Sequence, residues 1–194
     1  PNDKVVALTF DDGPHGELTP KLLDLLRSHG VAATFFVIGS RAEMYPDITA
    51  RIAEEGHEIG NHTWNHRSLA NQSAGQALVS LRQTSDVIAG LTGKSCKLVR
   101  PPFGHTNARV RSLLNSNGYY QIMWDVDTRD WKDSSPSGIL SRILAKVHPG
   151  SIVLFHDIHP GALRALPILI PAMKRAGFRF LTVSQLLGII HAAS

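Results

Sequence analysis

The stretch Val5-Val6-Ala7-Leu8-Thr9-Phe10-Asp11-Asp12-Gly13-Pro14 decides how this chain folds. Its apolar and β-branched residues form an unbroken run that is typical of a buried strand, and Gly13-Pro14 stops that strand. The adjacent carboxylates Asp11 and Asp12 therefore stand at the strand tip, where they repel each other unless a positive charge lies nearby. A metalloenzyme has a use for such a pair, because one carboxylate binds a cation while the other keeps a lone pair for proton transfer.

Strand-like and helix-like runs alternate along the rest of the 194 residues, which predicts a mostly parallel sheet. The expected strands are Val5–Phe10, Ala33–Ile38, Glu58–Asn61, Lys97–Val99, Gln121–Trp124, Ser151–Phe155 and Arg179–Leu181. The expected helices are Leu18–His29, Asp47–Glu55, Ala74–Leu91, Ala108–Asn117, Ser137–Val147, Leu163–Ala176 and Ser184–His191.

Two architectures fit this βα repeat: a (β/α) barrel of fewer than eight strands, and an open doubly wound sheet. The glycine-rich phosphate-binding fingerprint is missing after the first strand, where Asp11-Asp12-Gly13-Pro14 stands instead. This difference argues against a dinucleotide-binding fold. With no linker, repeat or low-complexity tract, residues 1–194 are predicted to form a single domain.

Composition narrows the classes of partner. The net charge is +4, and no run of Lys or Arg stands out, so we expect no nucleic-acid partner. Mild basicity suits an anionic polymer such as a cell wall. No apolar stretch reaches the ~18 residues of a membrane span, and the single Cys96 excludes an intrachain disulfide. We expect an extracellular or cell-wall location, reached by an export signal that is absent from this chain.

Polar side chains that can do chemistry follow the ends of five expected strands. Parallel strands place their carboxyl ends on one face, and that face carries the site in a barrel or an open sheet. The residues concerned are Asp11, Asp12, His62, His66, Arg100, Asp125, Asp127, Asp130, Trp131, His156 and Asp157.

The segment His62-Thr63-Trp64-Asn65-His66 has the i, i+4 spacing with which two imidazoles converge on one cation. Alone, such a pair is more often made of surface or core histidines. Together with a carboxylate at a neighbouring strand tip it becomes a His₂Asp set, whose three ligands leave an open position for water or substrate. Ligand softness favours zinc, although cobalt, nickel and iron fit similar geometry.

Two further residues have features of an active site. Arg100 precedes Pro101-Pro102, which stiffen the segment, and a rigid Arg near Asp11 keeps that carboxylate ionised. His156 follows a buried run, and either Asp130 or Asp127 is placed to hold its second nitrogen and raise its proton affinity.

Other polar residues have plainer interpretations. Trp131, on a loop above the face, is expected to stack on a sugar or to wall a small pocket. Asp157 is interpreted as a turn or cap residue. His105 and His159 are interpreted as structural or surface residues, but they lie near the face, so contact with the substrate is the alternative for both.

In these residues the sequence resembles the polysaccharide deacetylases, the NodB-homology domain of carbohydrate esterase family four. Five motifs of that family occur in order along nearly the whole chain. They are Thr9-Phe10-Asp11-Asp12-Gly13, His62-Thr63-Trp64-Asn65-His66, Arg100-Pro101-Pro102-Phe103-Gly104, Asp127-Thr128-Arg129-Asp130-Trp131 and Leu154-Phe155-His156-Asp157.

The resemblance implies an α/β fold, a distorted (β/α)7 barrel with mostly parallel strands and outer helices. It also implies that Asp12, His62 and His66 hold one divalent metal, with Zn²⁺ expected and Co²⁺ or Ni²⁺ as alternatives.

The family pattern assigns catalytic roles as well. It makes Asp11 the general base, tuned by Arg100, and it makes His156 the general acid, oriented and tuned by Asp130.

The acetyl group is handled by a further set of residues in this pattern. Trp131 and Leu154 wall the methyl pocket, and the backbone amide of Phe103 helps to bind the oxyanion. The family often has Tyr at this position, so Phe103 keeps the amide and lacks the hydroxyl.

The implied activity is removal of acetyl groups from glycans that contain N-acetylglucosamine, such as peptidoglycan or chitin, with acetylxylan as the alternative substrate. Short loops indicate an open groove for a polymer or oligomer, and a monomer is expected.

Two other classes of protein fit the sequence less well. A phosphatase with an Asp nucleophile needs a phosphate cradle, and a non-catalytic glycan-binding module is expected to have lost a ligand, the base or the acid.

Overall fold

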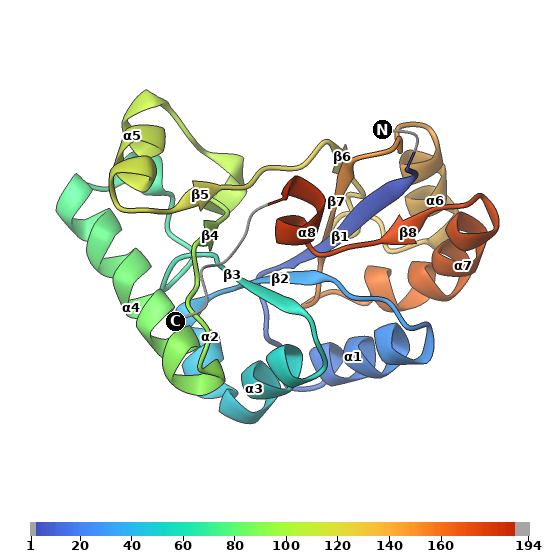
Figure 1. Ribbon diagram of the computed structural model, residues 1–194, viewed down its shortest axis with the longest axis horizontal. Helices are drawn as coiled ribbons and strands as arrows, with labels where there is room; N and C mark the ends of the chain where they lie inside the picture. Colours follow the sequence, from blue (N-terminus) through green and yellow to red (C-terminus); the bar gives the residue numbers. More distant parts are fainter. Residues whose placement is uncertain (1–2, 189–194) are drawn as a thin grey trace.

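The computed structural model describes residues 3–188, and its centre is one curled sheet whose strand pairings are parallel (Figure 1). Along the sheet the strand order is β5-β4-β3-β2-β1-β7-β6, and β8 pairs with the start of β1. The strands are β1 (Val5–Asp11), β2 (Thr34–Val37), β3 (Glu58–Asn61), β4 (Leu98–Val99), β5 (Tyr120–Gln121), β6 (Val126–Asp127), β7 (Ser151–His156) and β8 (Arg179–Phe180).

Most of the helices surround the outer side of this sheet, which confirms the predicted distorted (β/α)7 barrel (Figure 1). The helices are α1 (Leu18–Ser28), α2 (Gly39–Met44), α3 (Pro46–Glu54), α4 (Ala74–Thr92), α5 (Ala108–Ser116), α6 (Pro136–Leu144), α7 (Gly161–Arg175) and α8 (Val183–Leu187), with short 3₁₀ turns η1 (Leu69–Asn71) and η2 (Pro102–Gly104). The last expected helix was Ser184–His191, of which residues 189–191 lie outside the described part.

The alternation of side chains along β1 builds two different layers. Val6, Leu8 and Phe10 are fully buried in the core between the sheet and the outer helices. Ala7 belongs to a smaller inner cluster, which α8 joins through Val183. Because successive side chains of a strand point to opposite faces, the inner row continues from Ala7 to the polar side chains at the strand's carboxyl end.

The chain between β5 and β6 differs from the expected strand Gln121–Trp124. The backbone N–H of Ile122 still donates to Val99 of β4 (2.9 Å), but that of Asp125 donates to Ile152 of β7 (3.2 Å). The carbonyls between them, those of Ile122 and Met123, accept from Arg100 at 3.4 and 3.2 Å. The segment therefore changes partners across the open seam of the barrel, and an arginine takes the place of a neighbouring strand.

Helix α2 has no counterpart among the helices expected from the sequence. Its first amides, those of Gly39 and Ser40, donate to the carbonyls of Thr63 and Trp64 at 2.9 and 3.0 Å. A Cβ on Gly39 would lie 2.5 Å from Thr84 Oγ1. The start of α2 thus depends on a loop more than twenty residues away, a contact that local pattern cannot indicate.

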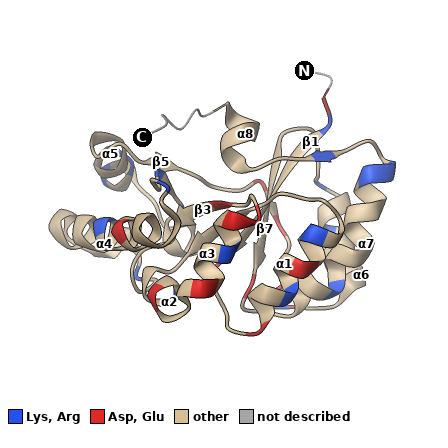
Figure 2. Ribbon diagram, turned by 60° about the horizontal axis from the view of Figure 1, so that its bottom comes forward, with Lys and Arg blue, Asp and Glu red and all other residues tan. Residues whose placement is uncertain are grey.

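Charged residues are interspersed over the outer helices (Figure 2). Between α1 and α3, Asp24 pairs with Arg51 at 2.6 Å and Arg27 pairs with Glu55 at 3.3 Å. Such exposed pairs contribute little stability. Among residues 3–188, none of the helices has the length and apolar character needed to cross a bilayer.

We predict that Leu166→Ala lowers the free energy of unfolding by about 2–5 kcal/mol, because it leaves a cavity in the core under α7. Leu166 is fully buried, whereas Ile168 on the same helix is 53% exposed, so Ile168→Ala serves as the matched control and should cost far less. Urea unfolding of both variants measures the difference. Equal losses would show that α7 does not pack as described.

Candidate active site

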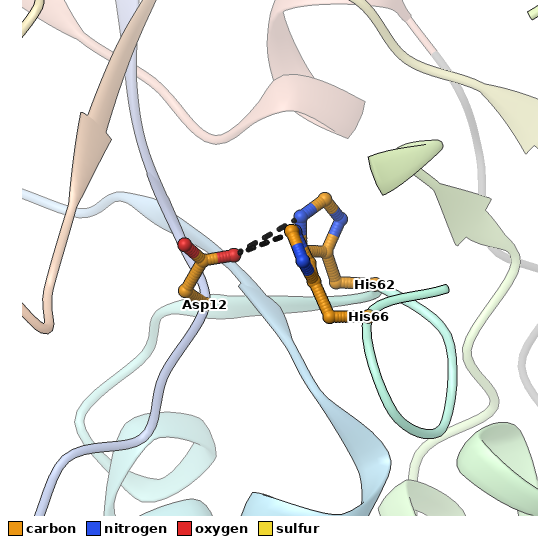
Figure 3. Close-up of side chains that lie close together, drawn as sticks. All are labelled: Asp12, His62 and His66. Atoms are coloured by element: carbon orange, nitrogen blue, oxygen red, sulfur yellow. Dashed lines mark ion pairs between the residues drawn. The ribbon is translucent and has the colours of Figure 1, made fainter. Parts of the chain in front are cut away.

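Three side chains from two strand ends converge at the carboxyl edge of the sheet (Figure 3). Asp12 follows β1, and His62 and His66 lie on the loop after β3. Asp12 Oδ1 lies 3.3 Å from His62 Nε2 and 3.1 Å from His66 Nε2. One ligand atom from each residue lies within 4.8 Å of the other two. The residues predicted from spacing to bind a metal are therefore brought together.

The hydrogen bonds around the Asp12-His62-His66 cluster orient its ligand atoms toward one another. His62 Nδ1 lies 2.7 Å from the backbone carbonyl of Arg100, and a carbonyl only accepts, so Nδ1 donates its proton there. His62 Nε2 is the ring nitrogen that faces the carboxylate of Asp12. Within residues 3–188, no hydrogen-bond donor satisfies the buried Asp12 Oδ1. A carboxylate and two imidazoles, one of them oriented by the Arg100 carbonyl, fit a divalent cation.

The ionisation of Asp12 also suits the binding of a cation. Burial raises the pKa of Asp12, but the imidazoles of His62 and His66 outweigh burial and hold the pKa well below its usual range. The carboxylate is therefore ionised at any pH at which the protein would bind a metal.

Asp11 occupies a different environment from its neighbour Asp12. Its Oδ1 accepts from Arg100 Nη1 at 2.7 Å, and the same nitrogen donates to Thr9 Oγ1 at 2.8 Å. Both Asp11 and Arg100 are buried. Arg100 also lies over the ring of Phe36, with Cζ 4.1 Å from its centroid. Asp11 Oδ2 is 3.8 Å from His62 Nε2, so the carboxylate stands beside the cluster.

His156, at the end of β7, stands across the same pocket. Its Nδ1 lies 2.8 Å from Asp130 Oδ1, and its backbone N–H donates to Asp130 Oδ2 at 2.9 Å. Burial lowers the pKa of His156, but Asp130, aided by Asp11 and Asp12, raises it to about 9. Of the two partners considered from the sequence, the structure selects Asp130. The carboxylate of Asp127 accepts instead from the amide of Arg129 at 2.9 Å.

A pocket of about 450 Å³ opens between these groups. Leu154 and Trp131 line it, the first 4% exposed and the second 55% exposed. Phe103 forms another wall, with its ring packed edge-on against His66 at 4.5 Å between centroids. His159 also lines the pocket, which agrees with the alternative that it contacts the substrate.

The loops that carry these residues are strained. Among residues 3–188, five residues other than glycine have positive φ, and such residues concentrate at functional sites when the surrounding structure holds them there. They are Asp12 (76°), Thr63 (68°), His66 (58°), Phe103 (61°) and Arg129 (53°).

Two acidic residues singled out in the sequence lie away from the pocket. Asp125 accepts from Ser151 Oγ and the amide of Ile152 at 2.7 and 2.6 Å, so it joins β7 to the seam. Asp157, expected to be a turn or cap residue, is buried and accepts from Thr19 Oγ1 at 2.6 Å. Burial raises the pKa of Asp157 to about 7.

Asp157 explains why glycine follows the two aspartates. A Cβ on Gly13 would lie 2.0 Å from Asp157 Oδ2, so only glycine fits there. The amide of Asp157 donates to the carbonyl of Asp11 at 3.3 Å. These contacts join the end of β7 to the turn that carries Asp11 and Asp12. Gly13 therefore does more than end the strand, as the sequence predicts: it also allows this close approach of Asp157.

The arrangement agrees with a comparison against known families, in which the polysaccharide deacetylase family matches residues 1–122. This chain belongs to the polysaccharide deacetylase family. A peptidoglycan-N-acetylglucosamine deacetylase of Bacillus cereus is 40% identical over 189 residues, which cover 95% of this chain and 69% of the relative.

Solved structures of other members have the same fold. PdaC of Bacillus subtilis, a peptidoglycan-N-acetylmuramic acid deacetylase, is 40% identical with a TM-score of 0.89, over 96% of this chain and 91% of that structure. The family 4 acetyl xylan esterase of Clostridium thermocellum, solved with a cobalt ion, is 36% identical with a TM-score of 0.88, over 96% and 91%. This chain spans 39% of the full length of PdaC.

We predict that His156 titrates with a midpoint of about 9 and that Asp130→Asn moves this midpoint downward. NMR of the imidazole protons measures both values. Because the folded pKa exceeds the ordinary value of 6.5, protonated His156 stabilises the fold fully below that pH. This stabilisation is lost as the pH rises through about 9.

Asp127→Asn is the matched control for this titration, because Asp127 lines the same pocket without bonding to His156. It should leave the midpoint close to that of the unmodified protein. A large downward shift in Asp127→Asn, with none in Asp130→Asn, would contradict the assigned pairing.

Proposed function

We propose that residues 1–194 form one catalytic domain, a metal-dependent deacetylase that hydrolyses the acetamido group of N-acetylglucosamine units in glycans. One observation carries this proposal: the Asp12-His62-His66 set, the Asp11–Arg100 pair and the His156–Asp130 pair all border one pocket. The pocket thus has a metal-ligand set, a carboxylate base and a protonated acid around one small volume, as amide hydrolysis requires.

In this proposal Asp12, His62 and His66 hold one divalent ion, and their nitrogen and oxygen donors favour Zn²⁺, with Co²⁺ or Ni²⁺ as alternatives. When bound, such an ion supplies Lewis-acid polarisation of the acetyl carbonyl and of the attacking water.

Asp11 acts as the general base and takes a proton from the attacking water. The ion pair with Arg100 holds the buried carboxylate in one orientation. The same guanidinium nitrogen also donates to Thr9 Oγ1, so the base is positioned before substrate arrives.

His156 acts as the general acid. Asp130 binds Nδ1, which leaves Nε2 to donate a proton to the departing sugar nitrogen. With its pKa raised to about 9, the imidazole is protonated at neutral pH. This favours N-acetyl over O-acetyl substrates, because an amine leaves only after protonation whereas an alkoxide is a better leaving group.

The substrate's acetyl group has its own contacts in this proposal. Trp131 and Leu154 enclose the methyl group, and the backbone amide of Phe103 donates to the developing oxyanion. The left-handed backbone at Phe103 supports a fixed direction for that amide.

The choice of glycan rests on the relatives. The Bacillus cereus relative is a peptidoglycan-N-acetylglucosamine deacetylase, which supports a cell-wall glycan as the substrate and an extracellular or cell-wall location. The second candidate, O-deacetylation of xylan, is supported by the acetyl xylan esterase of Clostridium thermocellum. We propose that the enzyme acts as a monomer without a nucleic-acid partner.

Acetate release from N-acetylated chitooligosaccharides, peptidoglycan and acetylxylan, each with and without a chelator, tests this function. We expect release that the chelator abolishes, and Asp11→Asn should lower turnover by about 10²–10⁴-fold because the water loses its base. Asp86→Asn, an exposed Asp on α4, is the control. Full activity in Asp11→Asn would reject Asp11 as the base.

Metal content gives a separate prediction. His62→Ala should release the ion, because two remaining ligands hold it weakly, whereas Asp11→Asn should retain it. Elemental analysis of the purified proteins measures the metal-to-protein ratio, and His29→Ala, remote from the cluster, is the control. Undiminished metal in His62→Ala would remove this histidine from the ligand set.

A further inference from the structure

A second hollow, of about 900 Å³, adjoins the pocket described above. It lies between the loop after β3 and the first half of α4, and the two hollows share His66 and Phe103 as walls. A ligand longer than the pocket can therefore pass over Phe103 from one hollow into the other. The volume of the second hollow falls within the range of small-molecule sites in proteins, which is roughly 300–1,000 Å³.

The lining of this hollow is amide-rich and nearly uncharged. Among the described residues that form it, Arg67 is the single Lys or Arg, and none carries a carboxylate. The amide side chains are those of Asn65, Asn71, Gln72, Gln76 and Gln83. Amides both donate and accept, as sugar hydroxyl and acetamido groups do. The chemistry thus fits a neutral polyhydroxylated ligand better than an acidic or basic peptide.

The shared wall supports a sugar in particular. Phe103 is 62% exposed although its backbone has φ of 61°, so the ring is presented to solvent by a strained residue. His66 and His105 pack against it at 4.5 and 5.4 Å between centroids and hold it in place. An exposed, fixed aromatic ring offers an apolar face with little entropy to lose on binding.

A buried hydroxyl stands in the wall of the hollow, although almost none of its oxygen is accessible to a ligand there. Ser68 is 8% exposed and lines the hollow, and within residues 3–188 its Oγ has no hydrogen-bond partner. Native structures rarely leave such a group unsatisfied. The adjacent Gln72 side chain donates to the carbonyls of Arg67 and Ser68 at 3.1 and 3.2 Å, which ties the loop around this hydroxyl to η1 and the start of α4.

We infer that this hollow is a binding subsite for the neighbouring sugar units of an uncharged N-acetylated glycan chain, which crosses Phe103 from the acetyl pocket. The inference rests on the proposed function and adds to it the path of the chain. It makes the enzyme's preference for longer chains depend on the loop after β3 and on α4.

Two glycines on α4 provide a matched test. A Cβ meets no atom within 4 Å at Gly75, which lines the hollow, or at Gly90, which does not. Gly75→Tyr fills the hollow, and Gly90→Tyr adds the same side chain elsewhere on the same helix. The readout is kcat/KM for acetate release from chitopentaose and from chitobiose, both fully N-acetylated. We expect Gly75→Tyr to lower the pentaose-to-biose ratio about tenfold, with Gly90→Tyr unchanged.

A second variant tests the subsite if Gly75→Tyr does not fold, and a binding measurement tests it without catalysis. Val79 is 66% exposed in the hollow, and Val79→Arg should lower the same ratio if Gly75→Tyr does not fold. Calorimetry measures the affinity of N-acetylated chitopentaose for the Asp11→Asn protein and for the same protein with Gly75→Tyr added. This measurement needs no turnover, and we expect Gly75→Tyr to weaken binding.

The outcomes separate the two proposals. If Gly75→Tyr and Val79→Arg both release acetate with an unchanged preference for the longer chain, the subsite is overturned and the proposed function stands. Pentaose binding that Gly75→Tyr weakens, in a protein that releases no acetate, supports the subsite and overturns the proposed function. Absence of both binding and release overturns both.

Discussion

The buried ion pair between Arg100 and Asp11 is the interaction on which the other features of the site depend. Arg100 is fully buried inside the barrel and reaches β1 through Asp11 and Thr9, at 2.7 and 2.8 Å. Its backbone amide donates to Asn61, and its carbonyl accepts from His62. Burying such a pair costs free energy that only good geometry offsets. Burial lowers the pKa of Arg100, and the ion pair with Asp11 opposes that shift.

This arrangement follows from the alternation along β1. The inner row begins with apolar Ala7, continues through Thr9 and ends at Asp11, so the barrel interior changes from apolar to polar along its axis. The apolar half is covered by α8 through Val183. The polar half opens into the pocket, where Asp12 turns away from its neighbour with a φ of 76°. Strain of this kind persists only where surrounding contacts hold it.

Much of the fold and of the candidate site was predictable from the sequence, for identifiable reasons. The expected run 5–10 corresponds to β1, because a continuous buried strand has a pattern that depends on nothing distant. Strand ends share an edge, so the catalytic residues could be grouped before any contact was known. Helix α2 and the seam after β5 were missed, since Gly39 bonds to Thr63 and Arg100 bonds to the carbonyl of Met123. These contacts join segments far apart in the chain.

The sequence by itself determined the βα repeat, the edge of the sheet that carries the chemistry and the residue types available there. Local pattern encodes these features, because burial and hydrogen bonding repeat with the period of each element. The residue pattern left Asp130 and Asp127 equal as partners of His156, the family resemblance favoured Asp130, and only the tertiary structure has the contact itself. It also supplies the contacts that set the two aspartates apart, because Asp11 faces Arg100 while Asp12 faces two imidazoles. Adjacent carboxylates look alike in a sequence, and only the groups that the fold places around each one give it a distinct charge environment.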